Sequence, residues 1–78
     1  MIKFTEMLIS EFLILNYKDK LRVINQTGQL QKILVLNECQ FSVYKVTDFY
    51  VELKRERHEF SFDTILAMSY EDLPPFYK

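Results

Sequence analysis

The sequence predicts a mainly β domain of the α+β class, in which an N-terminal helix precedes a strongly bent antiparallel sheet of about five strands that closes into a small barrel. Apolar residues recur at helical spacing near the N-terminus and at every second position further along the chain. One glycine and two prolines leave little room for long loops. With 78 residues, 49% of them apolar, the chain suits a single small domain.

The helix is expected at about residues 4–16. Its apolar residues fall at helical spacing, namely Phe4, Met7, Leu8, Phe12 and Leu15, and polar residues share the opposite side. Other apolar residues make the apolar side of this helix wider than packing against one neighbouring element requires. The helix is therefore expected either to cap the sheet or to offer an association surface. An alternative makes "FLILNY" a strand that pairs with "LRVIN", because short apolar runs fit both structures.

The barrel is expected at about residues 20–70, beginning with a hairpin in "KLRVINQTGQLQKILVL". Its turn falls at Thr27 and Gly28, because glycine adopts turn conformations at least cost. The second strand is expected to run on through "CQFSVYKV", after a polar interruption at Asn37 and Glu38. Such an interruption is typical of a bend or bulge, where a barrel strand changes direction.

A second turn is expected at Thr47 and Asp48. On either side of a charged tip at residues 54–58, apolar and polar residues alternate, which predicts a second hairpin with one buried face. Its apolar positions are Phe49, Val51 and Leu53 before the tip, and Phe60 and Phe62 after it. "TILAMS" then continues as a last short strand.

Residues 71–78 are expected to form an extended tail, because Pro74 and Pro75 end regular structure and favour polyproline II. "PPFY" matches a pattern that WW domains bind. The alternative is that Phe76 and Tyr77 fold back and cover apolar surface, for example on the helix.

The stretch from "RVINQTGQLQKILVL" to "EFSFDTILAMS" resembles the Sm-like barrel of the Rho-binding antiterminator family, and more distantly Hfq and WYL domains. In these families a hairpin is followed by a hydrophobic strand, a polar turn, and a strand ending in leucine, Asp, any residue and Ile. The corresponding residues here are Phe62, Asp63, Thr64 and Ile65. The resemblance implies an Sm-like fold and a non-catalytic binding module that acts on the Rho termination factor.

Acidic side chains are the candidate protein-binding residues, since the resemblance implies a surface that docks a basic partner. They are Glu38, Asp48, Glu52 and Asp63. The alternative is ordinary charge that keeps the surface soluble. Asp63 also fits a structural role, in which its carboxylate accepts a backbone hydrogen bond at a turn.

Basic side chains near the hairpin tip are the candidate nucleic-acid site. They are Lys54, Arg55, Arg57 and His58, with Lys20 and Arg22 extending the set. Neighbouring tyrosines offer stacking surfaces for bases, so Sm-like RNA binding is the second functional prediction. The alternative is a solvated turn whose charges prevent edge pairing. A small neutralising protein, either an immunity factor or a phage-type inhibitor, is the third prediction.

No cofactor, metal or catalytic site is predicted. One His and one Cys are too few for a zinc site, and no glycine-rich loop or Ser, His and Asp arrangement occurs. The chain is therefore not expected to be an enzyme. Because Cys39 is the single cysteine, a reducing, cytoplasmic location is expected.

No membrane contact is predicted, because the longest apolar runs have four residues and a spanning helix needs about 20. The apolar helix residues Ile9 and Leu13, together with the sheet edges, leave a homo-oligomer open.

Overall fold

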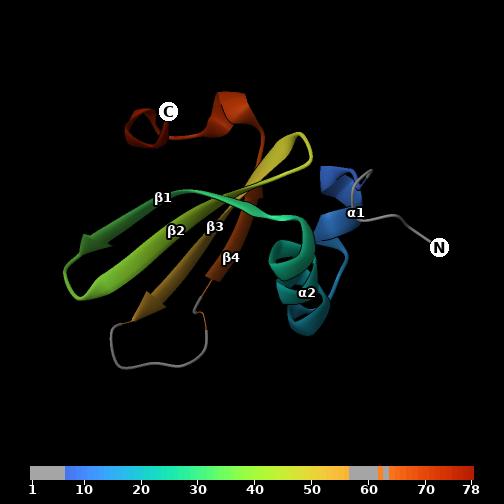
Figure 1. Ribbon diagram of the computed structural model, residues 1–78, viewed down its shortest axis with the longest axis horizontal. Coiled ribbons are helices and arrows are strands. Elements are labelled where there is room, and N and C mark those ends of the chain that lie inside the picture. The colour runs from blue at the N-terminus through green and yellow to red at the C-terminus, as the bar shows by residue number, and fades with distance from the viewer. Residues whose placement is uncertain (1–6, 57–61, 63) are drawn as a thin grey trace.

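The computed structural model describes residues 7–56, 62 and 64–78. Within this part of the chain, two short helices precede a four-stranded antiparallel sheet of order β1-β2-β3-β4 (Figure 1), which confirms the α+β class. The helices pack on one face of the sheet and the C-terminal segment on the other. The elements are α1 (Ile9–Leu13), α2 (Tyr17–Thr27), β1 (Gln29–Leu36), β2 (Cys39–Val46), β3 (Phe49–Glu56), β4 (Thr64–Met68) and two 3-10 turns, Tyr70–Asp72 and Pro75–Tyr77.

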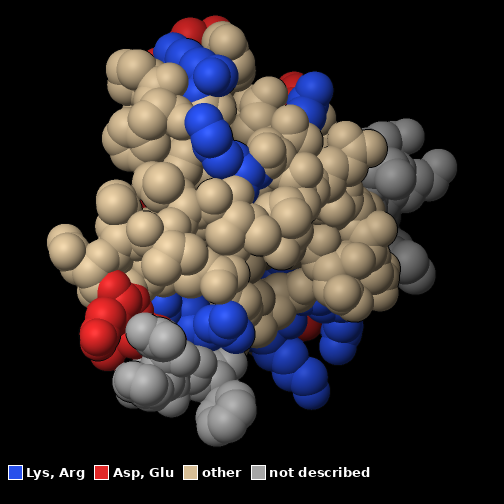
Figure 2. Space-filling view, turned by 60° about the vertical axis from the view of Figure 1, so that its left-hand side comes forward, with Lys and Arg blue, Asp and Glu red and all other residues tan. Residues whose placement is uncertain are grey.

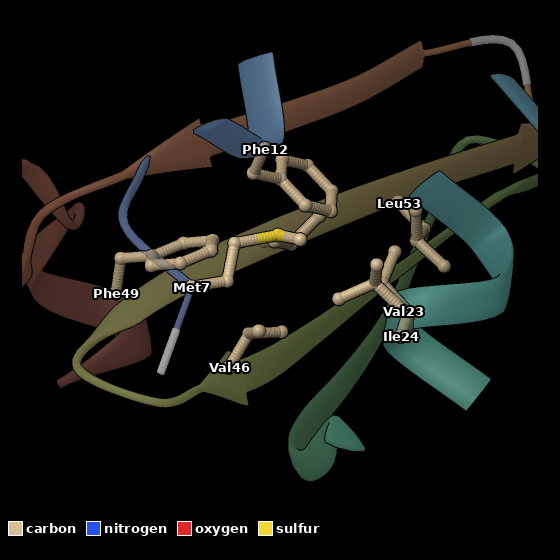
Figure 3. Close-up of a cluster of buried hydrophobic side chains, with 8 residues drawn as sticks. Met7, Phe12, Val23, Ile24, Val46, Phe49 and Leu53 are labelled. Atoms are coloured by element: carbon tan, nitrogen blue, oxygen red, sulfur yellow. The ribbon is translucent and has the colours of Figure 1, made fainter. Parts of the chain in front are cut away.

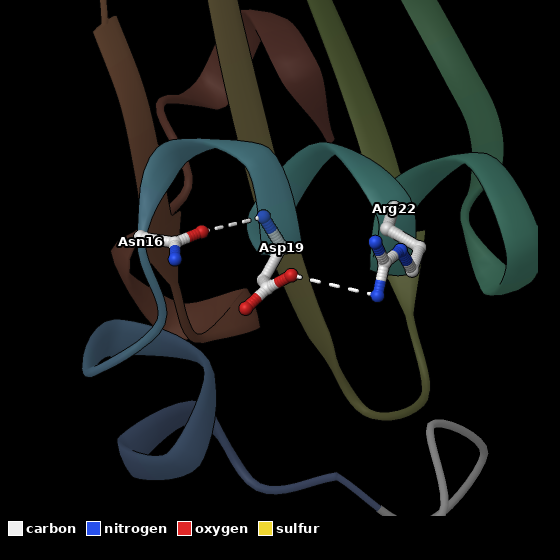
Figure 4. A network of polar contacts seen from close by, with 3 residues as sticks. All are labelled: Asn16, Asp19 and Arg22. Atoms are coloured by element: carbon white, nitrogen blue, oxygen red, sulfur yellow. Dashed lines mark hydrogen bonds and ion pairs between the residues drawn. The ribbon is translucent and has the colours of Figure 1, made fainter.

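The helical region is divided in two, which corrects the prediction of one helix at about 4–16; residues 4–6 of that helix lie outside the described residues. α1 ends at Leu13 and α2 begins at Tyr17. The division falls at Asn16, whose side-chain oxygen accepts a hydrogen bond from the Asp19 N–H at 2.8 Å (Figure 4). Asn is a favoured N-cap because it satisfies one of the free N–H groups of the first turn.

α2 occupies the place of the first predicted strand, so the hairpin at Thr27 and Gly28 was wrong, as was the alternative strand in "FLILNY". The Thr27 hydroxyl donates to the carbonyl oxygen of Val23 at 2.8 Å, and the Gly28 N–H donates to that of Ile24 at 2.8 Å. Both bonds close the last helical turn. Gly28 has a φ of −72°, so the backbone at this position does not need the positive φ that glycine allows. A Cβ at this position would lie 2.5 Å from the Ile24 oxygen.

Asn37 and Glu38 form a two-residue turn between β1 and β2, which corrects the predicted bend or bulge. Both have positive φ, 49° and 65°, as a type I′ hairpin turn requires. The second predicted turn, at Thr47 and Asp48, is confirmed and joins β2 to β3. The Thr47 hydroxyl there donates to the carbonyl oxygen of Met7 at 3.0 Å, which fixes the N-terminal segment to this turn.

The described strands form an open sheet, whereas the sequence predicted about five strands and a closed barrel. β1 and β4 are its two edges. The physical reason is that residues 21–26, which would have supplied a further strand, are helical. The predicted last strand is confirmed as β4, which pairs Thr64 with Lys54 of β3. β1 does contain a bulge, but it lies between Leu30 and Lys32 and not at the predicted position, Asn37.

The main core lies between the helices and the sheet (Figure 3). The predicted inward positions Phe49, Val51 and Leu53 of β3 are all buried, with at most 3% of their surface exposed. Phe12 of α1 packs against Phe49, with ring centroids 5.5 Å apart, and Val23 of α2 completes the layer. Each such side chain contributes about 1.5–3 kcal/mol to folding. The predicted inward position Phe60 lies outside the described residues.

The C-terminal segment folds onto the sheet face opposite the helices, so the prediction of an extended tail was wrong. Leu73 and Tyr77 pack on Val43 of β2, while Phe76 stays exposed. The alternative that the tail folds back is therefore confirmed for Tyr77, but on the sheet rather than on the helix. With Tyr77 buried, the "PPFY" pattern does not present its tyrosine to a WW domain.

We expect Asn16→Ala to lower the free energy of unfolding by about 0.5–2 kcal/mol, because the Asp19 N–H then loses its acceptor. Asn16→Ser keeps an acceptor and should lose much less. Urea denaturation followed by circular dichroism measures both. Equal stabilities of the two variants would contradict the cap.

We expect Gly28→Ala to destabilise the fold by about 1–3 kcal/mol, since the added Cβ meets the Ile24 oxygen. Without this clash the substitution would stabilise, by about 0.4–1 kcal/mol through the unfolded state. Gln26→Ala, at an exposed position of α2, is the control and should leave thermal unfolding nearly unchanged. A higher melting temperature for Gly28→Ala would contradict the close contact.

Candidate interaction groove

A groove of about 630 Å³ lies where α2 crosses the sheet. Its apolar lining comes from both layers: Leu21 and Ile24 belong to α2, and Tyr44 and Leu53 to the sheet. Phe62 lines it as well. Four further residues supply its polar and backbone lining, namely Lys18, Arg22, Asn25 and Gly28. We call this site the α2 groove.

The helical period places one side of α2 along the α2 groove. Lys18, Leu21, Arg22 and Asn25 are three or four residues apart and therefore share that side. The next side of α2 carries Val23 and the buried core. From the sheet, Tyr44 and Leu53 reach the groove because they belong to the face that the helices cover.

The charges at the α2 groove are basic. Arg22 forms an ion pair with Asp19, with 3.6 Å between Nη1 and Oδ1 (Figure 4), and both side chains are about half exposed. An exposed pair of this kind contributes little, so the guanidinium remains available to a ligand. Arg55 lies over the Phe62 ring, 5.9 Å from its centroid, and its buried Nε has no hydrogen-bond partner among the described residues.

The predicted basic site is divided by the fold. Arg22 lines the α2 groove and Arg55 lies beside it, but Lys54 belongs to the opposite face of the sheet. Lys20 lies over the Phe12 ring, 5.8 Å from its centroid, and lines a separate hollow of about 180 Å³. Arg57 and His58 lie outside the described residues. Figure 2 shows a mostly uncharged face with basic side chains along its lower margin and others toward its upper end.

The predicted acidic site does not form one surface either. Glu38 lies in the β1–β2 turn and Asp48 in the β2–β3 turn, so they are at opposite ends of the sheet. Glu52 belongs to the face that the C-terminal segment covers, where it lies close to Tyr77. Asp63 lies outside the described residues.

Among the residues that the structure describes, no group of three or more His, Cys, Asp or Glu side chains could hold a metal ion. Cys39 is a free, half-buried thiol at the start of β2. None of the described helices is both long and apolar enough to pass through a bilayer.

The sequence did not predict the apolar lining of the α2 groove. The alternating pattern predicted a strand for Leu21 and Ile24. It also predicted that Leu53 points inward, but not that a helix covers this residue. One signal in the sequence could have revealed this side of α2, namely the spacing of Lys18, Leu21, Arg22 and Asn25. This spacing fits one side of a helix once Asn16 is recognised as its N-cap.

We compared the chain with protein-family models, with curated proteins and with solved structures, and found no match in any of the three. The function proposed below therefore rests on the residues and their geometry.

The phenol of Tyr77 has a raised pKa, because burial disfavours the phenolate and the nearby Glu52 carboxylate adds repulsion. Below about pH 10, the ordinary tyrosine value, the phenol is protonated in both the folded and the unfolded chain, so its contribution to stability is fully present. Above that pH the unfolded chain loses the proton first, so we expect stability to fall. Tyr77→Phe should reduce this alkaline loss in denaturation measured at several pH values; an identical loss in the variant would contradict it.

Proposed function

We propose that this chain is a non-catalytic protein-interaction module whose α2 groove binds an acidic, partly apolar segment of a partner protein. The observation that supports this most strongly is the apolar lining beside basic side chains. The volume of about 630 Å³ falls in the range of binding clefts, about 300–1,000 Å³.

The apolar lining favours a partner that inserts a large apolar residue. Leu21, Ile24 and Leu53 come from two layers of the fold and converge on one space. An inserted Leu or Phe would bury apolar surface there, with a gain of about 25 cal/mol per Å².

The basic side chains favour acidic residues on either side of that anchor. Lys18 and Arg22 are four residues apart on the same side of α2, so both charges face one bound segment. Arginine is also suited to a two-point contact with a carboxylate, which adds orientation to the attraction.

Single-stranded RNA in the same groove is the second candidate. Tyr44 and Phe62 are aromatic rings on which bases would stack, as in an Sm-like mode of binding. The aliphatic part of the lining favours the peptide instead, because it suits an apolar side chain better than a base.

The resemblance to the Rho-binding antiterminator family gives the proposal a more specific form, in which the chain regulates transcription by docking a basic surface of the Rho factor. The geometry supports this form less, because Glu38 and Asp48 lie at opposite ends of the sheet. A neutralising protein would instead hold an acidic loop of its target in the α2 groove. The single cysteine supports a reducing, cytoplasmic location for each form.

Selection from a random peptide display library tests the proposal. We expect enriched peptides to combine Asp or Glu with a large apolar residue. Lys18→Glu and Arg22→Glu should each weaken binding of a labelled enriched peptide about tenfold, or about 1.4 kcal/mol, in fluorescence anisotropy. Lys54→Glu, on the opposite face of the sheet, is the matched control and should bind almost as the wild type does.

Two results would contradict the peptide proposal. One is enrichment of basic peptides, and the other is equal loss of binding in Lys54→Glu and Arg22→Glu. Binding of an oligouridine strand that falls steeply with salt and is lost in Arg22→Glu would favour the RNA candidate. The antiterminator form would be favoured if the chain copurified with the Rho hexamer and if reversing the charge of Glu38 or Asp48 abolished this copurification.

A further inference from the structure

We propose that the partner segment bound at the α2 groove is an acidic amphipathic α-helix, which lies beside α2 and extends over the uncovered end of the same sheet face. This inference rests on the proposed function, because it specifies the conformation and the extent of the segment that the α2 groove binds. It adds a second surface to that groove, which we call the β shelf. The β shelf consists of Ile33 and Val35 of β1, Ser42 of β2 and Arg55 of β3.

The strand register places the β shelf on the same face of the sheet as the α2 groove. Leu53, which lines the groove, lies opposite Ser42, and Ser42 in turn lies opposite Ile33. Paired residues of antiparallel strands share a face, and so do residues two apart along one strand. Val35 and Arg55 therefore continue this face toward the β1–β2 turn.

The described helices leave the β shelf uncovered. β1, β2 and β3 have eight residues each, or about 26 Å of length. α1 and α2 lie toward the end of the sheet where β1 begins (Figure 1), and the side chains of Ile33 and Val35 remain 51% and 65% exposed. β3 continues for three residues beyond Leu53, or about 10 Å, which is close to the distance between the axes of two packed helices.

The floor of this space favours a helix over an extended segment. β2 and β3 are each paired on both sides, so their N–H and C=O groups are engaged within the sheet. An extended segment lying on such a floor would leave its own backbone groups without partners. A helix satisfies its backbone groups internally and contacts the floor with side chains alone.

α2 provides the lateral contact for the bound helix. Leu21 and Asn25 are four residues apart and line the α2 groove, and rows of this spacing are the ridges that pack into the grooves of a second helix. α2 has 11 residues, or about 16 Å of length. A partner helix that lies beside all of it has about three turns and presents apolar residues at positions i, i+3, i+4 and i+7.

Phe62 brings the basic side chains to one end of this surface. The Phe62 N–H donates to the hydroxyl oxygen of Tyr17 at 2.9 Å, and the Arg55 guanidinium carbon lies 5.9 Å from the centroid of the Phe62 ring. Tyr17 is the first residue of α2, and Lys18 follows it. The opposite end of the surface, over β1, carries the apolar residues of the β shelf.

Charge complementarity makes an acidic helix the occupant. Lys18 and Arg22 line the α2 groove, and both acidic residues of β3, Glu52 and Glu56, belong to the opposite face of the sheet. The buried Nε of Arg55 has no hydrogen-bond partner among the described residues, so a carboxylate that reaches it satisfies a donor that is otherwise costly to bury. The partner helix therefore carries Asp or Glu at the end over β3 and apolar residues toward β1.

Two peptides of equal composition test the conformation. Each has about 14 residues and contains Glu, Leu and Ala, and a helix of this length is marginal when isolated in water. In the first peptide Leu recurs at i, i+3, i+4 and i+7 and Glu gathers at one end; in the second Leu occupies every second position. We expect the first to bind the full chain at least about tenfold more tightly in fluorescence anisotropy. Its helical circular dichroism signal should increase on binding.

Matched variants locate the contact. Ile33→Glu and Leu66→Glu each place a carboxylate at a side chain that is 51% exposed, but Leu66 belongs to the opposite face of the sheet. Ile33→Glu should weaken binding of the helical peptide at least about tenfold, whereas Leu66→Glu should leave it unchanged. Arg55→Gln should also weaken it, with little effect on a peptide in which Gln replaces Glu. Circular dichroism of each variant alone checks that it is folded.

The two proposals fail in different ways. The helix inference is overturned if the alternating peptide binds as tightly, if the helical signal does not increase, or if Ile33→Glu binds as the wild type does. In these cases weaker peptide binding by Lys18→Glu and Arg22→Glu would leave the proposed function intact. If neither peptide binds, the helix inference is again overturned, while the proposed function fails only if display selection also enriches no acidic peptide.

Discussion

The burial of one face of β3 is the constraint on which the rest of the structure depends. Phe49, Val51 and Leu53 need a cover, and a chain of this length has few residues from which to build one. α1 covers the Phe49 end through Phe12, and α2 covers the middle through Val23. Two short helices do not reach across the whole sheet, so the helical layer ends before β1. The α2 groove is one place where this layer leaves the sheet incompletely covered.

The alternating part of the chain could be predicted from the sequence, because the pleat of a strand imposes period two on burial. The turn at Thr47 and Asp48, the buried face of β3 and the strand β4 all follow from that rule. Residues 21–26 show its limit. Leu21 and Val23 alternate as in a strand, yet they lie in a helix because Asn16 caps its start and the Gly28 N–H closes its last turn.

The candidate site was less predictable for a physical reason. Charges such as Lys18 and Arg22 are visible in the sequence, but their neighbours depend on how α2 lies across the sheet, which no local pattern determines. The same applies to Lys54 and Arg55, which are adjacent in sequence and reach opposite faces of β3. The turn at Glu38 was also hard to predict. Its positive φ is imposed by the twist of the hairpin and is not a preference of glutamate.

The order of the strands also bears on how the chain folds. Each strand pairs with its neighbour in sequence, so the sheet needs only short loops to close, and assembly of this kind is rapid. The bond from Lys32 to the Phe76 carbonyl instead joins groups 44 residues apart. Closing so long a stretch of chain costs more entropy than closing a hairpin, so we expect the C-terminal segment to dock after the strands have paired.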